Sequence, residues 1–159
     1  MDLNNIKKFI FLFFLIGICF SQKNNIYAEL GGAGYLRTFN YERMLTDNII
    51  ARFGFGFEKN QNESGYSEDE FLRFYPLGTA YLFGAGEHRL EIGGGLTLLD
   101  GTLEMNGDVI EENQSTLFIG SGYRYNQESG GLLFCVKGYY LSLGEFSAPW
   151  FGISLGWTF

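Results

Sequence analysis

The chain has 159 residues, a net charge of −7 at pH 7, 23 glycines against 2 prolines, and 18% aromatic residues. This acidity argues against nucleic acid as a partner, and a mainly helical protein is disfavoured because each glycine weakens a helix by about 1 kcal/mol. Abundant Phe and Tyr with abundant Gly are typical of strands, in which aromatic side chains cover one face and glycine leaves room on the other. The length suits one domain.

The first 21 residues have the three parts of a secretory signal peptide. Lys7 and Lys8 are followed by an apolar run at 9–20, interrupted only by a glycine, and the run ends at the small-x-small sequence Cys19-Phe20-Ser21. The run is too short to span a bilayer as a helix. We therefore expect cleavage after Ser21, which leaves residues 22–159 as the mature domain with a net charge of about −8.

Two other interpretations of this segment stay open. It could be a buried N-terminal helix or membrane anchor, and lipid attachment at Cys19 would need a small residue where Ile18 stands. Once the signal is removed, Cys135 is the only cysteine, so no internal disulfide can form. A lone thiol without a histidine nearby in sequence is interpreted as a small strand residue rather than a nucleophile.

Beyond the signal, strand-like segments of about ten residues recur between turn signals. Eight are predicted, at 25–33, 36–45, 49–58, 71–83, 89–98, 115–125, 131–141 and 149–159.

The connections between these segments alternate in length. Those at 46–48, 84–88 and 126–130 are short, those at 59–70 and 99–114 are long, and 142–148 is intermediate. The first hairpin, near Gly34, departs from the pattern by being short. Short turns at one end and longer loops at the other are typical of a membrane β-barrel, whose even strand number places both termini in the periplasm. Aromatic residues near the strand ends, such as Tyr41 and Trp157 at one rim and Tyr35 and Trp150 at the other, are expected to form interfacial girdles.

The last segment alternates most clearly. Its odd positions Phe151, Ile153, Leu155, Trp157 and Phe159 are apolar, and the residues between them are Gly152, Ser154, Gly156 and Thr158. Successive side chains of a strand point to opposite faces. The apolar face would form the core of a soluble sandwich, whereas in a membrane barrel it would face lipid.

The other segments favour the membrane barrel, because their second face combines glycine with isolated charges. An eight-stranded barrel has an interior just wide enough for side chains to fill. Either these charges pair and neutralise the lumen, or they line a gated pore or proton path. The predicted lumen-facing charges are Glu29, Glu42, Arg52, Arg73, Glu91, Arg124 and Lys137.

Here the chain resembles a known family. Phe159, with Trp157, Leu155 and Ile153 at alternate positions, resembles the assembly signal read by the bacterial outer-membrane insertion machinery. Internal phrases such as Tyr41-Glu42-Arg43 and Gly122-Tyr123-Arg124-Tyr125 resemble small barrels of the OmpA/OmpW-like outer-membrane superfamily, particularly those of Bacteroidetes-type bacteria.

The resemblance covers nearly the whole mature chain. It implies an all-β, eight-stranded antiparallel up-and-down transmembrane β-barrel in a Gram-negative outer membrane. It also implies contacts with membrane lipid, lipopolysaccharide and the insertion machinery, and says little about activity.

Residues that would carry other chemistry are few. Acidic side chains between the strands could collect Ca²⁺ or Mg²⁺, but they lack the spacing of a calcium loop. His88, the only histidine, is expected in a turn, and no G-x-S-x-G or zinc motif is present. These acidic residues are Glu63, Glu68, Asp69, Glu70, Asp100, Glu104, Asp108, Glu111 and Glu112.

We therefore predict no catalytic, cofactor or metal site. The expected function is that of a monomeric, non-enzymatic outer-membrane barrel with a membrane-structural role or surface-binding loops. The alternative is a narrow channel or carrier for small or hydrophobic solutes, and a lipid-modifying barrel enzyme or a soluble ligand-binding β-barrel is less favoured.

Overall fold

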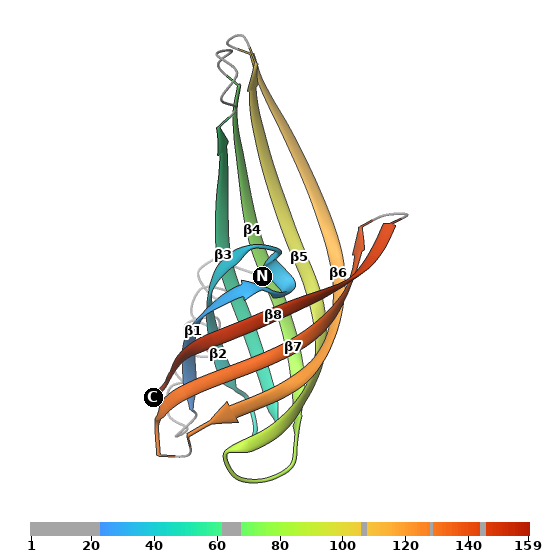
Figure 1. The fold of residues 1–159 in the computed structure, drawn as a ribbon. Helices are drawn as coiled ribbons and strands as arrows, with labels where there is room; N and C mark the ends of the chain where they lie inside the picture. Colours follow the sequence, from blue (N-terminus) through green and yellow to red (C-terminus); the bar gives the residue numbers. More distant parts are fainter. Residues whose placement is uncertain (1–22, 62–67, 106–107, 128, 144–145) are drawn as a thin grey trace, which may run out of the picture.

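The computed structural model describes residues 23–61, 68–105, 108–127, 129–143 and 146–159, and these residues form eight antiparallel strands that close into a barrel (Figure 1). Each strand pairs with the next, and β1 closes on β8 from Asn25↔Thr158 to Gly31↔Gly152. The predicted up-and-down barrel is thus confirmed. The strands are β1 (Asn24–Gly31), β2 (Arg37–Met44), β3 (Ile49–Gln61), β4 (Glu68–Phe83), β5 (His88–Met105), β6 (Asp108–Asn126), β7 (Gly131–Leu143) and β8 (Phe146–Thr158).

The predicted signal peptide, residues 1–21, lies outside the described residues. Within the described ranges, no helix has the length and apolar character needed to cross a membrane. One short 3₁₀ turn, η1 (Gly32–Gly34), joins β1 to β2.

Large apolar side chains point outward from the barrel. On β8, Phe151, Leu155 and Trp157 are 75%, 59% and 58% exposed, whereas Ser154 and Thr158 are buried. The eight residue steps from Phe151 to Phe159, at about 3.3 Å each on a strand tilted by about 40°, span roughly 20 Å along the barrel axis. This is close to the apolar band of about 25 Å on transmembrane barrels. The exposed apolar belt is therefore a lipid-facing surface.

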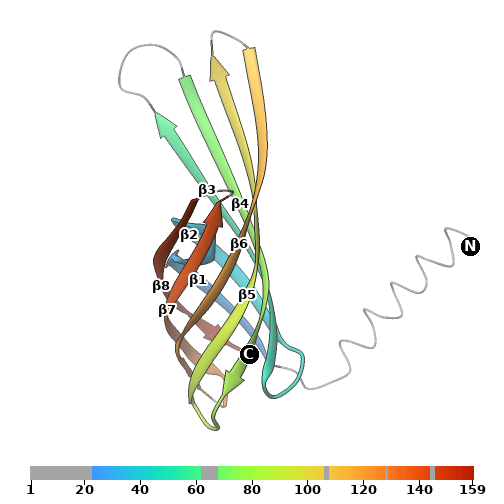
Figure 2. The ribbon, with the colours of Figure 1, turned by 90° about the vertical axis from the view of Figure 1, so that its right-hand side faces the viewer.

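Strands β4 to β6 are the longest, and β3 to β6 extend beyond the barrel rim at one end (Figures 1 and 2). Pairing of β2 with β3 stops at Thr38↔Gly56, and pairing of β6 with β7 stops at Leu117↔Ser142. Pairing among β3, β4, β5 and β6 continues outward from there. We call the segments 57–61, 68–73, 99–105 and 108–114 the projecting sheet.

The projecting sheet corrects the prediction of long loops at 59–70 and 99–114. Strand pairing continues through residues 59–61 and 68–70 and through 99–105 and 108–114. The sequence signal was weak because 59–61 and 68–70 are entirely polar, although Leu99, Leu103 and Met105 alternate with polar residues. An antiparallel ladder in water satisfies its backbone hydrogen bonds without needing an apolar face.

The opposite end of the barrel, the short-turn end, carries the connections 45–48 and 84–87 and the described residues 127 and 129–130 between β6 and β7. Gly84 and Gly86 supply the positive φ angles of one turn, at 98° and 78°. Arg89 links two turns, because its guanidinium donates to the carbonyl oxygens of Gly86 and Asp47 at 3.0 and 2.7 Å. The short turns predicted from sequence therefore lie together at one rim.

The connection between β1 and β2 folds into the lumen. Thr97 Oγ1 donates to the carbonyl of Ala33 at 2.6 Å, and the hydroxyl of Tyr35 donates to Thr116 Oγ1 at 2.8 Å. Tyr35, expected in an outer girdle, instead points inward. Its φ of 67° and ψ of −66°, with Leu36 N donating to Gly34 O at 2.9 Å, form a tight three-residue turn that reverses the chain inside the rim.

Candidate functional site

Six of the seven predicted lumen charges lie inside the barrel and are buried. Glu42 and Arg124 are fully covered, and the other four are at most 7% exposed. Over the described residues these are three acids and three bases, so their charges sum to zero. Buried charges require partners, and the barrel supplies them across the lumen. The six are Glu29, Glu42, Arg52, Glu91, Arg124 and Lys137.

Four of these charges alternate in sign around the lumen, from β2, β3, β5 and β6. Arg124 lies between two carboxylates: its Nη1 is 2.8 Å from Glu91 Oε2 and 3.3 Å from Glu42 Oε2, and its Nη2 contacts Glu42 Oε1. Arg52 contacts Glu91 and lies 3.5 Å from Glu42. Each of the four stands two or three residues from the short-turn end of its strand. Closure of the barrel therefore brings them to one level.

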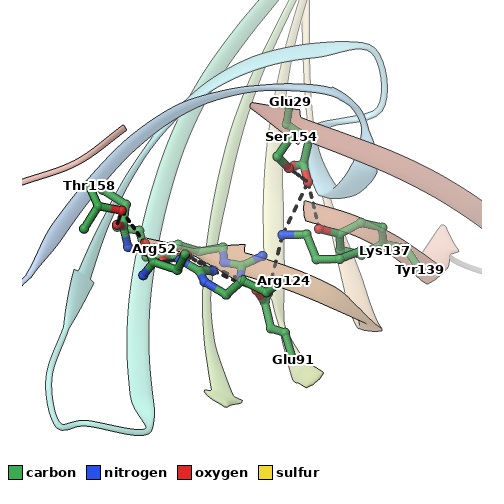
Figure 3. Close-up of polar contacts among 11 residues, drawn as sticks. Glu29, Arg52, Glu91, Arg124, Lys137, Tyr139, Ser154 and Thr158 are labelled. Carbon is green, nitrogen blue, oxygen red and sulfur yellow. Dashed lines mark hydrogen bonds and ion pairs between the residues drawn. The ribbon is translucent and has the colours of Figure 1, made fainter. Parts of the chain in front are cut away.

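Lys137 extends this network toward β1, β7 and β8 (Figure 3). Its Nζ is 3.4 Å from Glu91 Oε1 and 3.5 Å from Glu29 Oε1. Glu29 also accepts hydrogen bonds from Tyr139 Oη at 2.9 Å and from Ser154 Oγ at 3.1 Å. The Lys137 ammonium is 5.7 Å from the ring centroids of Tyr27 and Tyr139, within cation–π range. All six charges thus belong to one connected cluster.

Sequence reasoning placed Ser154 and Thr158 on the face opposite the apolar stripe, but it did not identify the neutral side chains as members of the network. Asn25 Nδ2 donates to Glu42 Oε1 at 2.7 Å. Thr158 Oγ1 lies 2.7 Å from Asn25 Oδ1 and also contacts Asn126. These residues share the inward face with the charges, as do Tyr139 and Ser154. Strand alternation could have found them, although it could not have identified their partners.

Arg73 is a correction, because it points away from the lumen. Its side chain is 49% exposed, and its Nη1 lies 3.2 Å from Asp100 Oδ2 on the neighbouring strand. The inward residues of β4 are its even-numbered ones, beginning with the buried Phe74 and Pro76. Both faces of β4 are largely apolar, so the sequence did not determine which face carries the lumen residues. Arg73 also stands in the projecting sheet, where an outward charge meets water.

Apolar clusters lie on both sides of the charge network. At the short-turn end, Met44, Ile50, Ala80 and Leu82 pack together in the interior. A second cluster, which includes Ala33 of η1, lies at the other end of the lumen, with Tyr35 packed against it. Charges with direct partners, enclosed by apolar layers, therefore fill the lumen. The members of the second cluster are Ala33, Phe118, Tyr139 and Leu141.

Three buried side-chain polar atoms have no hydrogen-bond partner among the described residues. They are Tyr27 Oη, Arg52 Nε and Arg124 Nε. All three border the charge network rather than a separate site, and the two guanidinium groups make ion pairs through their terminal nitrogens.

The remaining candidates have simple environments. His88 begins β5, is exposed, and its Nδ1 is 2.5 Å from Tyr123 Oη. Cys135 is buried beside Tyr27 and Leu133. Within the described ranges, no three His, Cys, Asp or Glu side chains converge as they would around a metal ion. Glu63 lies outside the described residues, as do the side chains of the other acidic candidates except Asp100, which pairs with Arg73.

The predicted C-terminal assembly residues form one outward stripe. Ile153, Leu155, Trp157 and Phe159 are between 54% and 60% exposed. Two backbone hydrogen bonds join Phe159 to Asn24, at 2.8 and 2.9 Å. The final residue therefore takes part in closing the barrel, and its side chain is accessible from the lipid side.

No protein-family model and no curated protein matches the chain. Several solved structures do. The N-terminal β-barrel domain of Pseudomonas aeruginosa OprF is 15% identical, with a TM-score of 0.61 over 87% of this chain and 96% of that one. Ail, the attachment invasion locus protein of Yersinia pestis, is 15% identical, with a TM-score of 0.55 over 87% and 95%. A major outer membrane protein from Thermus thermophilus is 13% identical, with a TM-score of 0.52 over 88% and 99%. At these identities the similarity establishes a shared fold.

Proposed function

We propose that this chain, which has the fold of the small OmpA-like outer-membrane barrels, is a non-enzymatic integral outer-membrane protein that presents a binding surface outside the cell. The observation that carries the proposal is the projecting sheet, which extends β3 to β6 beyond the barrel rim (Figure 2). The paired and enclosed lumen charges support a barrel that is filled rather than one that conducts. A channel would need a continuous polar path, which the two apolar clusters interrupt.

The orientation follows from the lengths of the connections. In outer-membrane barrels the short turns lie in the periplasm and the longer elements lie outside. The short-turn end would then face the periplasm, together with both ends of the mature chain. The projecting sheet would stand on the outer surface of the cell, where it can meet other macromolecules.

The projecting sheet has two open edges. Beyond Gly56, β3 has no strand partner on its β2 side, and between Asp108 and Asn113 β6 has none on its β7 side, among the residues that the structure describes. An edge strand presents rows of backbone donors and acceptors. An extended peptide can add to such an edge as a further strand. The geometry therefore favours recognition of an extended polypeptide.

The charge of the projecting sheet indicates the chemical class of its binding partner. Its sequence contains nine acidic residues and two basic ones, a net charge of −7, which equals that of the whole chain. Opposite charge across an interface steers association and selects partners. Ail has been solved in complex with a heparin analogue, sucrose octasulfate. A sulfated ligand would be repelled by the projecting sheet of this chain, so we propose a basic polypeptide instead.

Location and binding are tested separately. The full chain, expressed in a Gram-negative host, should pellet with outer membranes and migrate differently on gels when unheated and when boiled. Recovery as a soluble periplasmic protein would refute the membrane proposal. Steady conductance in planar bilayers would favour the channel.

The binding test uses the barrel in phosphatidylcholine vesicles and a labelled peptide of alternating Lys and Val. We expect binding that weakens about fivefold for each acidic residue neutralised, since one charge near a charged surface contributes about 1 kcal/mol. Glu111→Gln with Glu112→Gln is the test variant, and Asp47→Asn, at the short-turn end, is the matched control. Backbone N-methylation keeps the peptide's charge but blocks strand pairing. Equal binding of the methylated peptide would rule out edge pairing.

A further inference from the structure

The projecting sheet has an inner face, which continues the lumen-lining face of β3 to β6 beyond the barrel rim (Figure 2). At the rim this face contains the buried Phe74, which is paired in register with Leu99. Residues paired in an antiparallel ladder lie on the same face, and successive residues of a strand alternate between faces. The register therefore assigns every second residue beyond the rim to the inner face. These residues are Glu58 and Asn60 of β3, Glu68, Glu70 and Leu72 of β4, Leu99, Gly101, Leu103 and Met105 of β5, and Asp108, Ile110, Glu112 and Gln114 of β6.

An apolar strip follows the centre of the inner face. It begins at the rim with Leu99 and Leu72, continues through Leu103, which is paired with Ile110, and ends near the tip at Met105. The six residue steps along β5 from Leu99 to Met105 span about 20 Å at about 3.3 Å each. An apolar strip on a sheet that stands outside the barrel is a candidate contact surface.

Carboxylates flank the apolar strip on both sides. In one row across the sheet, Glu58 of β3 and Glu112 of β6 stand at the two ends, with Leu72 and Gly101 between them. In the outermost row, acidic residues again stand on both sides of Met105. The inner face therefore has three parts, an apolar centre and two acidic borders. Its acidic residues are Glu58, Glu68, Glu70, Asp108 and Glu112.

The inner face includes no Lys or Arg. The two basic residues of the projecting sheet, Lys59 and Arg73, follow the alternation onto the outer face, where Arg73 lies 3.2 Å from Asp100. Neither connection at the tip contains Lys or Arg in its sequence. One inner carboxylate, Glu58, forms an ion pair at 3.1 Å with Arg37 of β2. The other four acidic residues make the face negative, so its charge is complementary to that of a cationic partner.

We propose that the inner face binds an amphipathic helix of a partner protein, whose apolar stripe is flanked on both sides by Lys or Arg. The proposal rests on the binding role proposed above for the projecting sheet and adds a second mode beside edge pairing. Three strand spacings of about 4.8 Å separate β3 from β6, which is about 14 Å. A helix with its side chains is about 10–12 Å wide, and about 13 residues of helix match the length of the apolar strip.

A helix matches the three-part face better than an extended chain does. An amphipathic helix presents an apolar stripe with polar residues on both sides. The aliphatic stems of Lys and Arg can lie along apolar surface while their charges reach the acidic borders. An extended segment presents only one line of side chains to the sheet, because alternate side chains point away. It could cover the apolar strip or one acidic border, but not both borders at once.

Two peptides of equal composition separate the helical mode from edge pairing. Both contain about 14 residues, half Leu and half Lys. In one the leucines follow the helical period, and in the other they alternate with lysine. Each labelled peptide is titrated with the barrel in phosphatidylcholine vesicles, and binding to empty vesicles is subtracted. We expect the helical-period peptide to bind the barrel, and a proline at its centre, which breaks the helix, to abolish that binding.

Neighbouring residues on opposite faces of β6 and β5 supply matched variants. At about 0.15 M salt the screening length is about 8 Å, so a charge on the outer face contributes less. Glu112→Gln should weaken binding of the helical-period peptide about threefold, as expected for an exposed ion pair, and Glu111→Gln should change it little. Leu103→Asn should weaken binding about tenfold through lost apolar contact, whereas Val109→Asn, on the outer face, should not. Different migration of unheated and boiled samples shows that each variant is folded.

Equal weakening by Glu111→Gln and Glu112→Gln would overturn the proposal, because edge pairing and general attraction treat the two carboxylates alike. Full binding by the Leu103→Asn variant or by the proline peptide would also overturn it. If only the alternating peptide binds, the helical mode is refuted and the proposed function stands. If neither peptide binds, both the helical mode and the proposed recognition of a basic polypeptide are refuted.

Discussion

Arg124→Gln should destabilise the barrel far more than Arg73→Gln, although the two arginines looked alike in sequence. Arg124 is fully buried and contacts Glu42 and Glu91, with its Nη1 2.8 Å from Glu91 Oε2. Arg73 makes one ion pair, with Asp100 at 3.2 Å, and its side chain is 49% exposed. The comparison therefore tests whether the lumen network is structural.

The expected magnitudes differ by several kcal/mol. Loss of Arg124 leaves two carboxylates short of a cation inside the lumen, and breaking a buried ion pair in this way costs about 3–5 kcal/mol. Loss of a surface pair costs less than about 1 kcal/mol. With a urea dependence of about 2 kcal/mol per molar, the unfolding midpoint should fall by about 2 M for Arg124→Gln and by less than about 0.5 M for Arg73→Gln.

Urea titration of the barrel in lipid vesicles measures both midpoints, with unheated gel migration as a second probe of folding. Salt at 1 M shortens the screening length to about 3 Å. It should remove the small effect of Arg73→Gln and leave that of Arg124→Gln, which is shielded from solvent. Equal shifts for the two variants would refute the argument and would mean that water in the lumen screens the charges.

Two further predictions concern the backbone and the chain end. Gly32→Ala places a Cβ 2.4 Å from the carboxyl carbon of Glu29 at a φ of 76°, so it should lower stability in urea by more than the 1–2 kcal/mol expected from left-handed backbone strain alone. Gly84→Ala, at a φ of 98° and with the nearest atom 3.6 Å from the added Cβ, should lose only the stability that this backbone strain costs. Equal losses of stability in the two variants would argue against an inward-folded η1. Deletion of Phe159 removes two backbone hydrogen bonds to Asn24, about 1 kcal/mol each. If Phe159 is also read by the insertion machinery, the folded fraction should fall much further in cells than in vesicles.

Much of the architecture was predictable from local pattern. Alternation along β8 separated Phe151 and Leu155 from Ser154. In the structure the first two side chains are exposed on the outside of the barrel, and Ser154 is buried inside it. The same reasoning placed Glu91 and Arg124 in the lumen. It failed for Arg73, because alternation is informative only where one face meets lipid and the other meets the lumen. In the projecting sheet the pattern is broken, because 59–61 and 68–70 are entirely polar and apolar residues alternate with polar ones only along 99–105.

The sequence by itself determined that the chain forms eight strands, and it determined the lipid-facing stripe of the last one. These properties depend on the period of two and on the transfer of apolar side chains to lipid. Only the tertiary structure decided which charges meet. Arg124 and Glu42 are 82 residues apart, and their contact depends on how the strands are staggered when β1 closes on β8. The inward turn between β1 and β2 was decided in the same way, because Thr97 of β5 and Thr116 of β6 hold it by hydrogen bonds.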